Sequence, residues 1–312
     1  MRVVKGFYDL GVGLPASAVT IGNFDGVHRG HQRVMKAAVT AGRDAGIPAV
    51  VCTFEPHTLK ILRPDRAPSL LQTLEQRLAA IEQLGVDVVV VIPFDDEVAA
   101  TGRRRFVDEF LCDELRVQSL HVSRGFSFGR GRGGRTEYLE ERAAEKQFTV
   151  VRVDAAQETG DTVSSSRIRA AVTEGRVADA AAMLGRPYSL SGTVIHGSGR
   201  GAQLGAPTAN IAPLNECLPG PGVYVGQLQG PDLDASAVMN VGVRPTFTST
   251  DELSFEAHLL DFDGDLYEAE VELRFIDRLR DERRFESPDA LSEQIQADAK
   301  MARRTLEATA SR

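Results

Sequence analysis

Short apolar runs and amphipathic stretches alternate along residues 1–185. The apolar runs are rich in β-branched residues, which predicts buried strands at residues 19–24, 49–54, 86–92, 117–122 and 148–153. Between them, apolar residues recur at helical spacing and predict helices, the clearest of which begins at Gly30 and ends before Gly46. Strands and helices in turn are typical of a parallel sheet covered by helices, so this half is predicted to be an α/β domain.

The pattern changes at Gly185-Arg186-Pro187, which predicts two domains, 1–185 and 186–312. Beyond this point helical periodicity disappears, and glycine and proline turns separate short runs that predict strands at residues 189–195, 223–228, 235–241, 253–260 and 268–275. Strands at this spacing without helices between them predict an antiparallel barrel or sandwich. A closing helix is predicted after Ser287, a suitable N-cap, with Pro288 at its first position.

A glycine-rich turn joins the first predicted strand to the first predicted helix. Residues 22–31 are Gly-Asn-Phe-Asp-Gly-Val-His-Arg-Gly-His. Free backbone N–H groups and the positive end of the helix dipole converge in such a turn, which favours a phosphate group there. His28 and His31 are three residues apart and can both face that site. From spacing alone, a structural histidine pair beside an ordinary glycine turn is an equally good interpretation.

The composition is that of a globular protein with a sizeable core. Hydrophobic residues make up 42% of the 312 residues and charged residues 26%. The formal charge of −8 argues against a general nucleic-acid-binding protein, although a local basic site remains compatible with it. The N-terminus lacks a signal-peptide pattern, and no apolar run is long enough to span a bilayer, so no membrane partner is expected.

The three cysteines, Cys52, Cys112 and Cys217, are widely separated and odd in number. They give neither a disulfide framework nor the spacing of a zinc site, and they fit a reducing compartment. We therefore expect a cytoplasmic protein. The sequence leaves open whether the chain forms a homo-oligomer.

Four stretches together resemble one enzyme family. Residues 22–31 are similar to the HxGH signature of nucleotidyltransferases, and residues 163–169 to the hydroxyl-and-arginine motif of the same superfamily. Residues 192–210 resemble the glycine-rich loop and the Pro-Thr-Ala-Asn motif of riboflavin kinases, and residues 255–267 resemble the catalytic strand of those kinases. In this order the motifs resemble those of the prokaryotic bifunctional riboflavin kinase/FMN adenylyltransferases, the FAD synthetases, over nearly the whole chain.

The resemblance implies a Rossmann-like nucleotidyltransferase domain that joins FMN to AMP from ATP and releases pyrophosphate, giving FAD. The attacking FMN phosphate is already mostly anionic near neutral pH because its second pKa is about 6, so hydrogen-bond donors and cations are needed rather than a base. His28 and His31 are expected to donate to the triphosphate. From the residues alone, the serines of residues 164–166 would only cap a helix. The implied nucleotide-binding residues are Gly22, Asn23, Phe24, Asp25, Ser164, Ser165 and Arg167.

For the second domain the resemblance implies a β-barrel that phosphorylates riboflavin to FMN with ATP. The riboflavin hydroxyl must lose a proton, and we predict the Glu256 carboxylate as its general base; strand alternation alone would make Glu256 a solvated residue. Thr208 and Asn210 are expected to hold Mg²⁺ and the ATP phosphates through oxygen ligands. The other implied binding residues are Gly197, Gly199, Arg200, Gly201, Pro207, Asn240, Arg244 and Arg283. The expected partners are small molecules, ATP and flavins, and no nucleic acid.

The sequence departs from the family pattern in three places. Gly125 stands where the family has Asp or Asn before a Phe-x-Phe-Gly segment, Ser166 replaces a usual threonine, and Glu268 stands where glycine is common. Glycine has no side chain to hydrogen-bond with, and the loss of one contact costs about 1 kcal/mol. One alternative is therefore a kinase-competent protein with weak or lost adenylyltransferase activity.

Two further alternatives arise from the same sequence. Between Arg124 and Arg135, arginines interleave with Phe126 and Phe128 as in RNA-binding segments, but a single short tract in an acidic chain makes RNA binding the remote alternative. The other is a nucleotidyltransferase for a different phosphorylated acceptor, with the barrel as a binding module. The Pro-Thr-Ala-Asn motif and Glu256 argue against it.

Overall fold

The computed structural model describes residues 1–8, 10–11, 13–154, 156–158, 161–197, 207–231, 233–244 and 252–310. The chain divides into two compact units, one made of Met1–Ser69 and Leu74–Ser164 and the other of Leu70–Thr73 and Ser165–Arg312. The compact units therefore divide ahead of two helices, α7 (Ser165–Thr173) and α8 (Val177–Leu184). The predicted boundary after residue 185, as a division between functional domains, stays a prediction.

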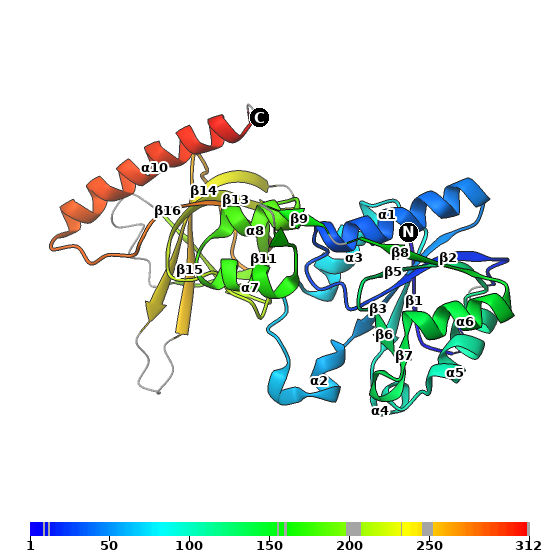
Figure 1. Ribbon diagram of the computed structural model, residues 1–312. Coiled ribbons are helices and arrows are strands. Elements are labelled where there is room, and N and C mark those ends of the chain that lie inside the picture. Colours follow the sequence, from blue (N-terminus) through cyan, green and yellow to red (C-terminus); the bar gives the residue numbers. More distant parts are fainter. Residues whose placement is uncertain are drawn as a thin grey trace. The chain divides into compact units, whose positions relative to one another are not determined.

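A six-stranded parallel sheet forms the centre of the first unit (Figure 1). Every neighbouring pair of its strands is parallel, so the predicted α/β domain is confirmed. In spatial order the strands are β1 (Arg2–Lys5), β4 (Val88–Pro93), β3 (Ala49–Glu55), β2 (Ser17–Ile21), β5 (Val117–Ser123) and β8 (Thr149–Val153). The sequence pattern missed β1, because this edge strand is short and mostly exposed.

The order of the strands contains a switch point between β2 and β5. From β2 the chain continues through β3 to β4 on one side, and it then crosses to β5 and β8 on the other. In open α/β sheets the crevice outside the carboxyl ends of two such strands is where ligands bind. The loop after β2 and the loop after β5 both begin at this crevice.

Helices cover both faces of the sheet. On one face, Met35 and Ile81 share a core cluster with Val51 and Val89 of the sheet; on the other face, Phe110 packs in a second cluster. The first face is covered by α1 (Arg29–Ala45) and α3 (Leu74–Glu82), and the second by the π-helical segment η2 (Phe106–Glu114) and α6 (Thr136–Lys146). The shorter elements are α2 (Thr58–Leu62), η1 (Pro64–Arg66), α4 (Asp96–Ala99), α5 (Arg103–Arg105), β6 (Ser127–Phe128), η3 (Arg130–Arg132), β7 (Gly134–Arg135), β9 (Gln157–Glu158) and β10 (Asp161–Thr162).

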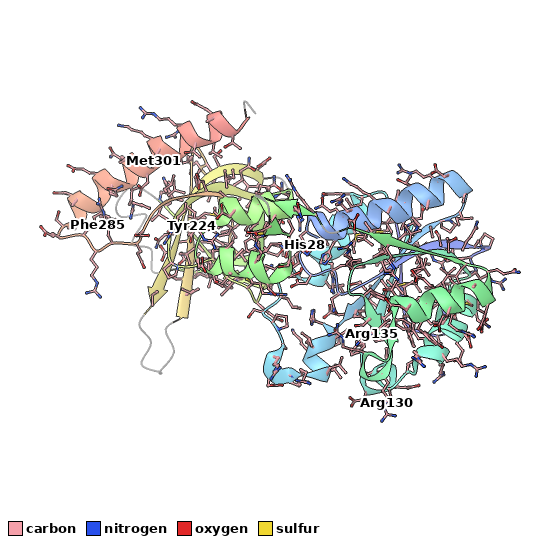
Figure 2. The ribbon with its side chains drawn as sticks, viewed as in Figure 1. His28, Arg130, Arg135, Tyr224, Phe285 and Met301 are labelled. Carbon is pink, nitrogen blue, oxygen red and sulfur yellow. The ribbon has the colours of Figure 1, made fainter. Side chains whose placement is uncertain are left out.

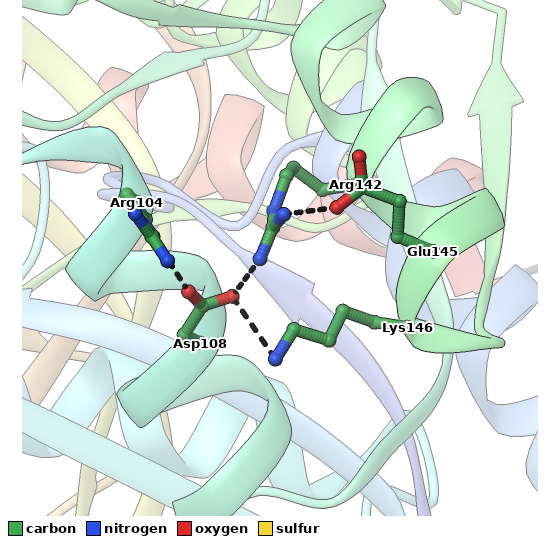
Figure 3. Close-up of polar contacts among 5 residues, drawn as sticks. All are labelled: Arg104, Asp108, Arg142, Glu145 and Lys146. Atoms are coloured by element: carbon green, nitrogen blue, oxygen red, sulfur yellow. Dashed lines mark hydrogen bonds and ion pairs between the residues drawn. The ribbon is translucent and has the colours of Figure 1, made fainter.

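Ion pairs connect η2 to α6 (Figure 3). The Asp108 carboxylate accepts a hydrogen bond from Arg142, and it lies 3.3 Å from Arg104 and 3.4 Å from Lys146. Arg142 also pairs with Glu145. The side chains of Arg142 and Asp108 are only 16% and 21% exposed, so water screens this pair less than one on the open surface. The network links α6 to η2, which packs on the sheet. Its members in the described part of the chain include no residue of the loop after β2.

Six antiparallel strands close into a barrel in the second unit (Figure 1). Around the barrel they are β11 (Tyr188–Ile195), β12 (Ala209–Pro213), β15 (Glu252–Leu259), β14 (Leu233–Arg244), β13 (Gly222–Gly230) and β16 (Glu270–Arg280). The long helix α10 (Pro288–Ala310) packs on it through Ala299 and Ala302. Ala290 N donates to Ser287 Oγ at 3.2 Å, which confirms the predicted N-cap.

Two details of the barrel differ from the prediction. The pattern missed β12 as a strand, because this five-residue segment ends in proline and has no strict alternation. Strand β16 begins two residues later than predicted, because Glu268 lies in the preceding turn with a left-handed φ of 65°. A non-glycine residue in this region is strained, which explains why glycine suits the position.

Candidate active sites

The predicted phosphate loop, residues 22–28, follows the carboxyl end of β2 and leads into α1. It turns sharply: Phe24, Gly26 and Val27 all have left-handed φ values, of 51°, 88° and 39°. Such values are uncommon for phenylalanine and still less common for a β-branched valine. Strained turns of this kind persist only where their surroundings hold them, and they cluster at ligand sites.

Asn23 is held through both its backbone and its side chain. Its carbonyl oxygen accepts from Thr53 Oγ1 at 3.1 Å, and its side-chain amide exchanges two hydrogen bonds with Thr58, at 3.1 and 3.2 Å. The sequence predicted Asn23 as a contact to ATP. The structure instead gives its amide a partner at the first residue of α2, so the role of Asn23 in the loop is at least partly to anchor it.

The two predicted histidines stand together at the start of α1, where Figure 2 labels His28. His28 is the N-cap residue, and its Nδ1 accepts from His31 N at 3.3 Å. The two rings stack with centroids 3.6 Å apart. Gly30 makes this possible, because a Cβ there would lie 3.0 Å from the His28 ring. The spacing of the motif therefore brings both imidazoles to one helix N-terminus, beside the strained turn.

The protonation of these histidines follows from their contacts. Because Nδ1 of His28 accepts a hydrogen bond, a neutral His28 carries its proton on Nε2 and can donate from there. Burial, together with the neighbouring His28, holds the pKa of His31 well below its ordinary value of 6.5. A neutral imidazole presents one N–H, which can donate to an anion.

A buried arginine, Arg77 of α3, completes this loop and was missed by the sequence analysis. Only 3% of Arg77 is exposed, yet its Nη1 donates to Asn23 O at 3.0 Å and its Nη2 donates to the Glu55 carboxylate. The signal was present in the sequence: residue 77 lies on the apolar stripe of its helix, three residues after Leu74 and four before Ile81. A charge at a core-facing position is rare without a polar partner.

The loop after β5 carries Gly125 and the arginine-rich segment. Gly125 has a left-handed φ of 78°, and a Cβ there would meet no atom within 4 Å. Phe128 is buried, with its ring 4.9 Å from that of Phe106 and 5.8 Å from that of Phe126. The Phe128 ring packs in the protein core and is not available to stack on bases, and Phe126 is partly buried against the same cluster, so the RNA-binding alternative is not favoured.

The second motif of the predicted adenylyltransferase site lies at the start of α7. Ser165 and Arg167 are in its first turn, and Ser164 directly precedes it. Ser164 belongs to the first compact unit and the helix to the second. Their predicted role in nucleotide binding stays a prediction.

In the barrel, three predicted residues form one row across neighbouring strands. Glu256 on β15 pairs in register with Asn210 on β12 and with Asn240 on β14. Paired residues of antiparallel strands project to the same face, while Phe255 and Ala257 on either side are buried in the barrel. The alternation predicted for β15 is confirmed. A carboxylate therefore lies between two amides on the outer face of the barrel.

The ends of this row are shaped by neighbouring loops. A Cβ on Gly197 would lie 2.0 Å from Asn210 Nδ2, so only glycine permits the backbone to approach that amide so closely. Thr208 lies two residues before Asn210 and lines a pocket of about 190 Å³ with Pro207, Asp265 and Tyr267. His258 Nδ1 lies 3.0 Å from Pro207 O, a contact that the sequence did not predict.

The remaining predicted residues are distributed as follows. Arg283 lies between β16 and α10, where it donates to Gln294 Oε1 and lies 4.8 Å from the centre of the Phe285 ring (Figure 2). Gly199, Arg200 and Gly201, and the side chain of Arg244, lie outside the described part of the chain. Among the described residues, no three His, Cys, Asp or Glu side chains gather as a metal cluster. No described helix is long and apolar enough to cross a bilayer.

Comparison with protein families finds two matches along the chain. The FAD synthetase family matches residues 14–167, and the riboflavin kinase family matches residues 184–306. The first matched region contains the histidine pair, and the second contains the row around Glu256.

Comparison with individual proteins extends these matches to the full length. Three curated relatives bear the name bifunctional riboflavin kinase/FMN adenylyltransferase. The protein from Pseudomonas fluorescens is 37% identical over 97% of both chains, that from Escherichia coli K12 is 35% identical over 97% of both, and that from Bacillus subtilis is 35% identical over 90% of both. A crystal structure of a macrolide-efflux protein from Streptococcus pneumoniae is similar with a TM-score of 0.87 and 28% identity, covering 97% of this chain and 99% of that one.

Proposed function

Because this chain belongs to the bifunctional riboflavin kinase/FMN adenylyltransferase family, we propose that its two activities use two separate sets of residues. The protein phosphorylates riboflavin to FMN with ATP, and it joins FMN to the adenylyl group of a second ATP to give FAD and pyrophosphate. We assign the first reaction to the row around Glu256 and the second to the loop that ends in His28 and His31. The predicted cytoplasmic location stays a prediction.

Adenylyl transfer needs alignment and charge stabilisation more than proton transfer. The FMN phosphate attacks the α-phosphorus of ATP, the bond to pyrophosphate breaks, and negative charge grows on the leaving group. Donors fixed at that position stabilise the transition state, and removing one such donor typically costs about 10²–10³ in rate. Nε2 of His28, the neutral His31 and the N-terminus of α1 are the donors that this loop offers. Ser164, Ser165 and Arg167 are proposed to bind the nucleotide from the start of α7.

Riboflavin phosphorylation needs a base. As the riboflavin hydroxyl attacks the γ-phosphorus of ATP, its proton passes to the Glu256 carboxylate and ADP leaves. The flanking amides of Asn210 and Asn240 support this role, because they leave Glu256 beside groups that can orient substrate oxygens. Arg244, Arg283 and Gly197 are proposed to contribute to substrate binding around it.

The donor set at one end of the row fits Mg²⁺. Thr208 and Asn210 offer neutral oxygens, and the close approach of Gly197 leaves a narrow cradle at Asn210. Hard oxygen ligands of this kind suit Mg²⁺ shared with phosphates. Bound there, the ion would neutralise charge on the ATP phosphates.

The observation that carries this proposal is that the histidine pair and the glutamate row lie in different units of one chain. Incubation with riboflavin, ATP and Mg²⁺, followed by chromatographic separation of the flavins, tests it. We expect FMN first and FAD afterwards. FMN without FAD would favour the alternative in which Gly125 has weakened adenylyl transfer, and the absence of both products would refute the proposal.

A further inference from the structure

Arg77 is an unusual residue for the inside of a domain. It is 3% exposed and projects from α3 among apolar residues such as Leu74, Leu78 and Ile81. A buried guanidinium is tolerated only when its charge is paired and its N–H groups are bonded. Glu55 supplies the charge partner, and the carbonyl of Asn23 supplies a second acceptor.

The second acceptor is what distinguishes Arg77 from an ordinary buried ion pair. Asn23 O receives two donors, Arg77 Nη1 at 3.0 Å and Thr53 Oγ1 at 3.1 Å, just ahead of the turn with left-handed φ at Phe24, Gly26 and Val27. A strained turn relaxes unless its ends are fixed. Fixing Asn23 O therefore fixes the direction in which the chain enters the turn.

The turn determines where the two histidines lie. Val27 N donates to Phe24 O at 3.0 Å, and His28 follows immediately as the N-cap of α1. Phe24 and Val27 are buried against the same core cluster as Ile81 of α3. A shift at Asn23 is thus transmitted directly to the position of the His28 and His31 rings.

We propose that Arg77 is a positioning residue for adenylyl transfer, which holds the Asn23 carbonyl and so keeps the strained 24–27 turn in the shape that presents His28 and His31 to the triphosphate. Arg77 acts through Asn23 and contacts no substrate. The proposal rests on the proposed function, because it presupposes that the histidines serve that reaction.

The test compares Arg77→Met with Arg142→Met. Arg142 is also a poorly exposed arginine paired with a carboxylate in the same unit, but it contacts no residue of the loop (Figure 3). FAD formation from FMN and ATP is measured under saturating substrates, together with thermal unfolding and FMN formation from riboflavin. We expect kcat for FAD formation to fall about 10²-fold in Arg77→Met, as for a small misplacement of reacting groups, while FMN formation is unchanged. Arg142→Met should lower the unfolding temperature but keep kcat for FAD formation within about twofold of the parental value, because distant sites that share no partner are usually not coupled.

Two milder variants keep the test decisive if Arg77→Met does not fold. Arg77→Lys retains the charge but not the planar fork that reaches both acceptors. Its kcat for FAD formation should therefore lie between that of Arg77→Met and that of the parent protein. Thr53→Val removes the other donor to Asn23 O with little change in shape. Both donors bind one carbonyl. The fold-loss of kcat for FAD formation in the double variant Arg77→Lys, Thr53→Val should therefore exceed the product of the fold-losses in the two single variants.

The outcomes separate this inference from the proposed function. If the parent protein makes FAD and folded Arg77→Met or Arg77→Lys makes it at the parental kcat, the positioning role is wrong while the function stands. Equal losses of kcat in Arg77→Met and Arg142→Met would likewise reduce Arg77 to a general structural residue. If the parent protein makes no FAD, the proposed function itself fails.

Discussion

Glu256 on β15 and Asn210 on β12 lie directly opposite each other in the barrel, paired in register and on its outer face. The pairing places a carboxylate beside an amide whose other neighbour is the backbone of Gly197. A general base must be held in position, and this pairing is compatible with the role proposed for Glu256.

The first prediction concerns this carboxylate. Glu256→Gln keeps the shape but removes the proton acceptor, so FMN formation should fall about 10²–10⁴-fold, while FAD formation from added FMN is unchanged. Glu272→Gln is the matched control, because Glu272 lies on β16 and pairs with Arg274. Parental FMN formation by Glu256→Gln would remove Glu256 from the role of base.

The second prediction separates two roles of His28. His28→Ala together with His31→Ala should abolish FAD formation and spare FMN formation, since both donors are lost. His28→Asn is informative because asparagine is a good N-cap and would preserve the start of α1 without the imidazole. We expect FAD formation to drop at least about 10²-fold in His28→Asn, the cost of one oriented donor. Full activity in His28→Asn would show that His28 only caps the helix.

The third prediction concerns Gly125. Asparagine tolerates left-handed φ better than most residues, and a side chain at residue 125 would meet open space. Gly125→Asn should therefore lower KM for FMN in the adenylyl transfer by about fivefold, the equivalent of about 1 kcal/mol. Gly125→Ala adds strain but no hydrogen bond, and it serves as the control. The expectation fails if the two variants have the same KM.

The fourth prediction is a loss of stability on acidification. Burial lowers the pKa of His121 below 6.5, and burial together with His28 lowers that of His31 further. Below pH 6.5 the unfolded chain binds protons that these folded histidines do not, so the free energy of unfolding falls as pH falls toward the lowered pKa values. Thermal unfolding between about pH 7.5 and about pH 5.5 should show this slope.

Substitution of one histidine tests the cause of that slope. His121→Asn should flatten it, whereas His196→Gln, at an exposed position, should leave it unchanged. A stability that rises on acidification would contradict the assignment.

The fifth prediction concerns the segment Leu70–Thr73, which belongs to the barrel unit although α3 follows it directly in the chain. Leu71 O accepts from Asn215 Nδ2 at 3.2 Å and from Tyr188 OH at 3.3 Å, and Asn215 Oδ1 accepts from Ser191 N at 2.9 Å. Asn215→Ala should cost about 1–3 kcal/mol of unfolding free energy, because it strands buried polar groups. Denaturant unfolding measures the loss. The Tyr188 hydroxyl lies closer to Cys217 O, at 2.6 Å, so the Leu71 carbonyl depends mainly on Asn215. An unfolding free energy unchanged by Asn215→Ala would contradict this prediction.

The prediction of the fold succeeded where one periodicity dominates a segment. The apolar runs of β2, β3 and β4 are buried on both faces, and such strands read as nearly continuous apolar stretches. It failed for β1 and β12, where exposure or a short length removes the pattern. The site prediction followed local motifs, so it proposed His28, His31 and Glu256 but did not predict the contacts of Arg77 with Asn23 and of His258 with Pro207, because those partners are distant in the sequence.

The sequence by itself determined the two kinds of domain and the order of their motifs, and it supplied the candidate residues for the chemistry, because these depend on local periodicity and on short spacings. Only the tertiary structure decided which distant groups meet. Contacts between segments far apart in the chain bring Arg77 and Thr53 to the Asn23 carbonyl and pack Phe128 in the core. They also align Asn210, Glu256 and Asn240 in one row. Side-chain contacts of this kind are set by how strands and helices pack, and no local pattern of residues specifies them.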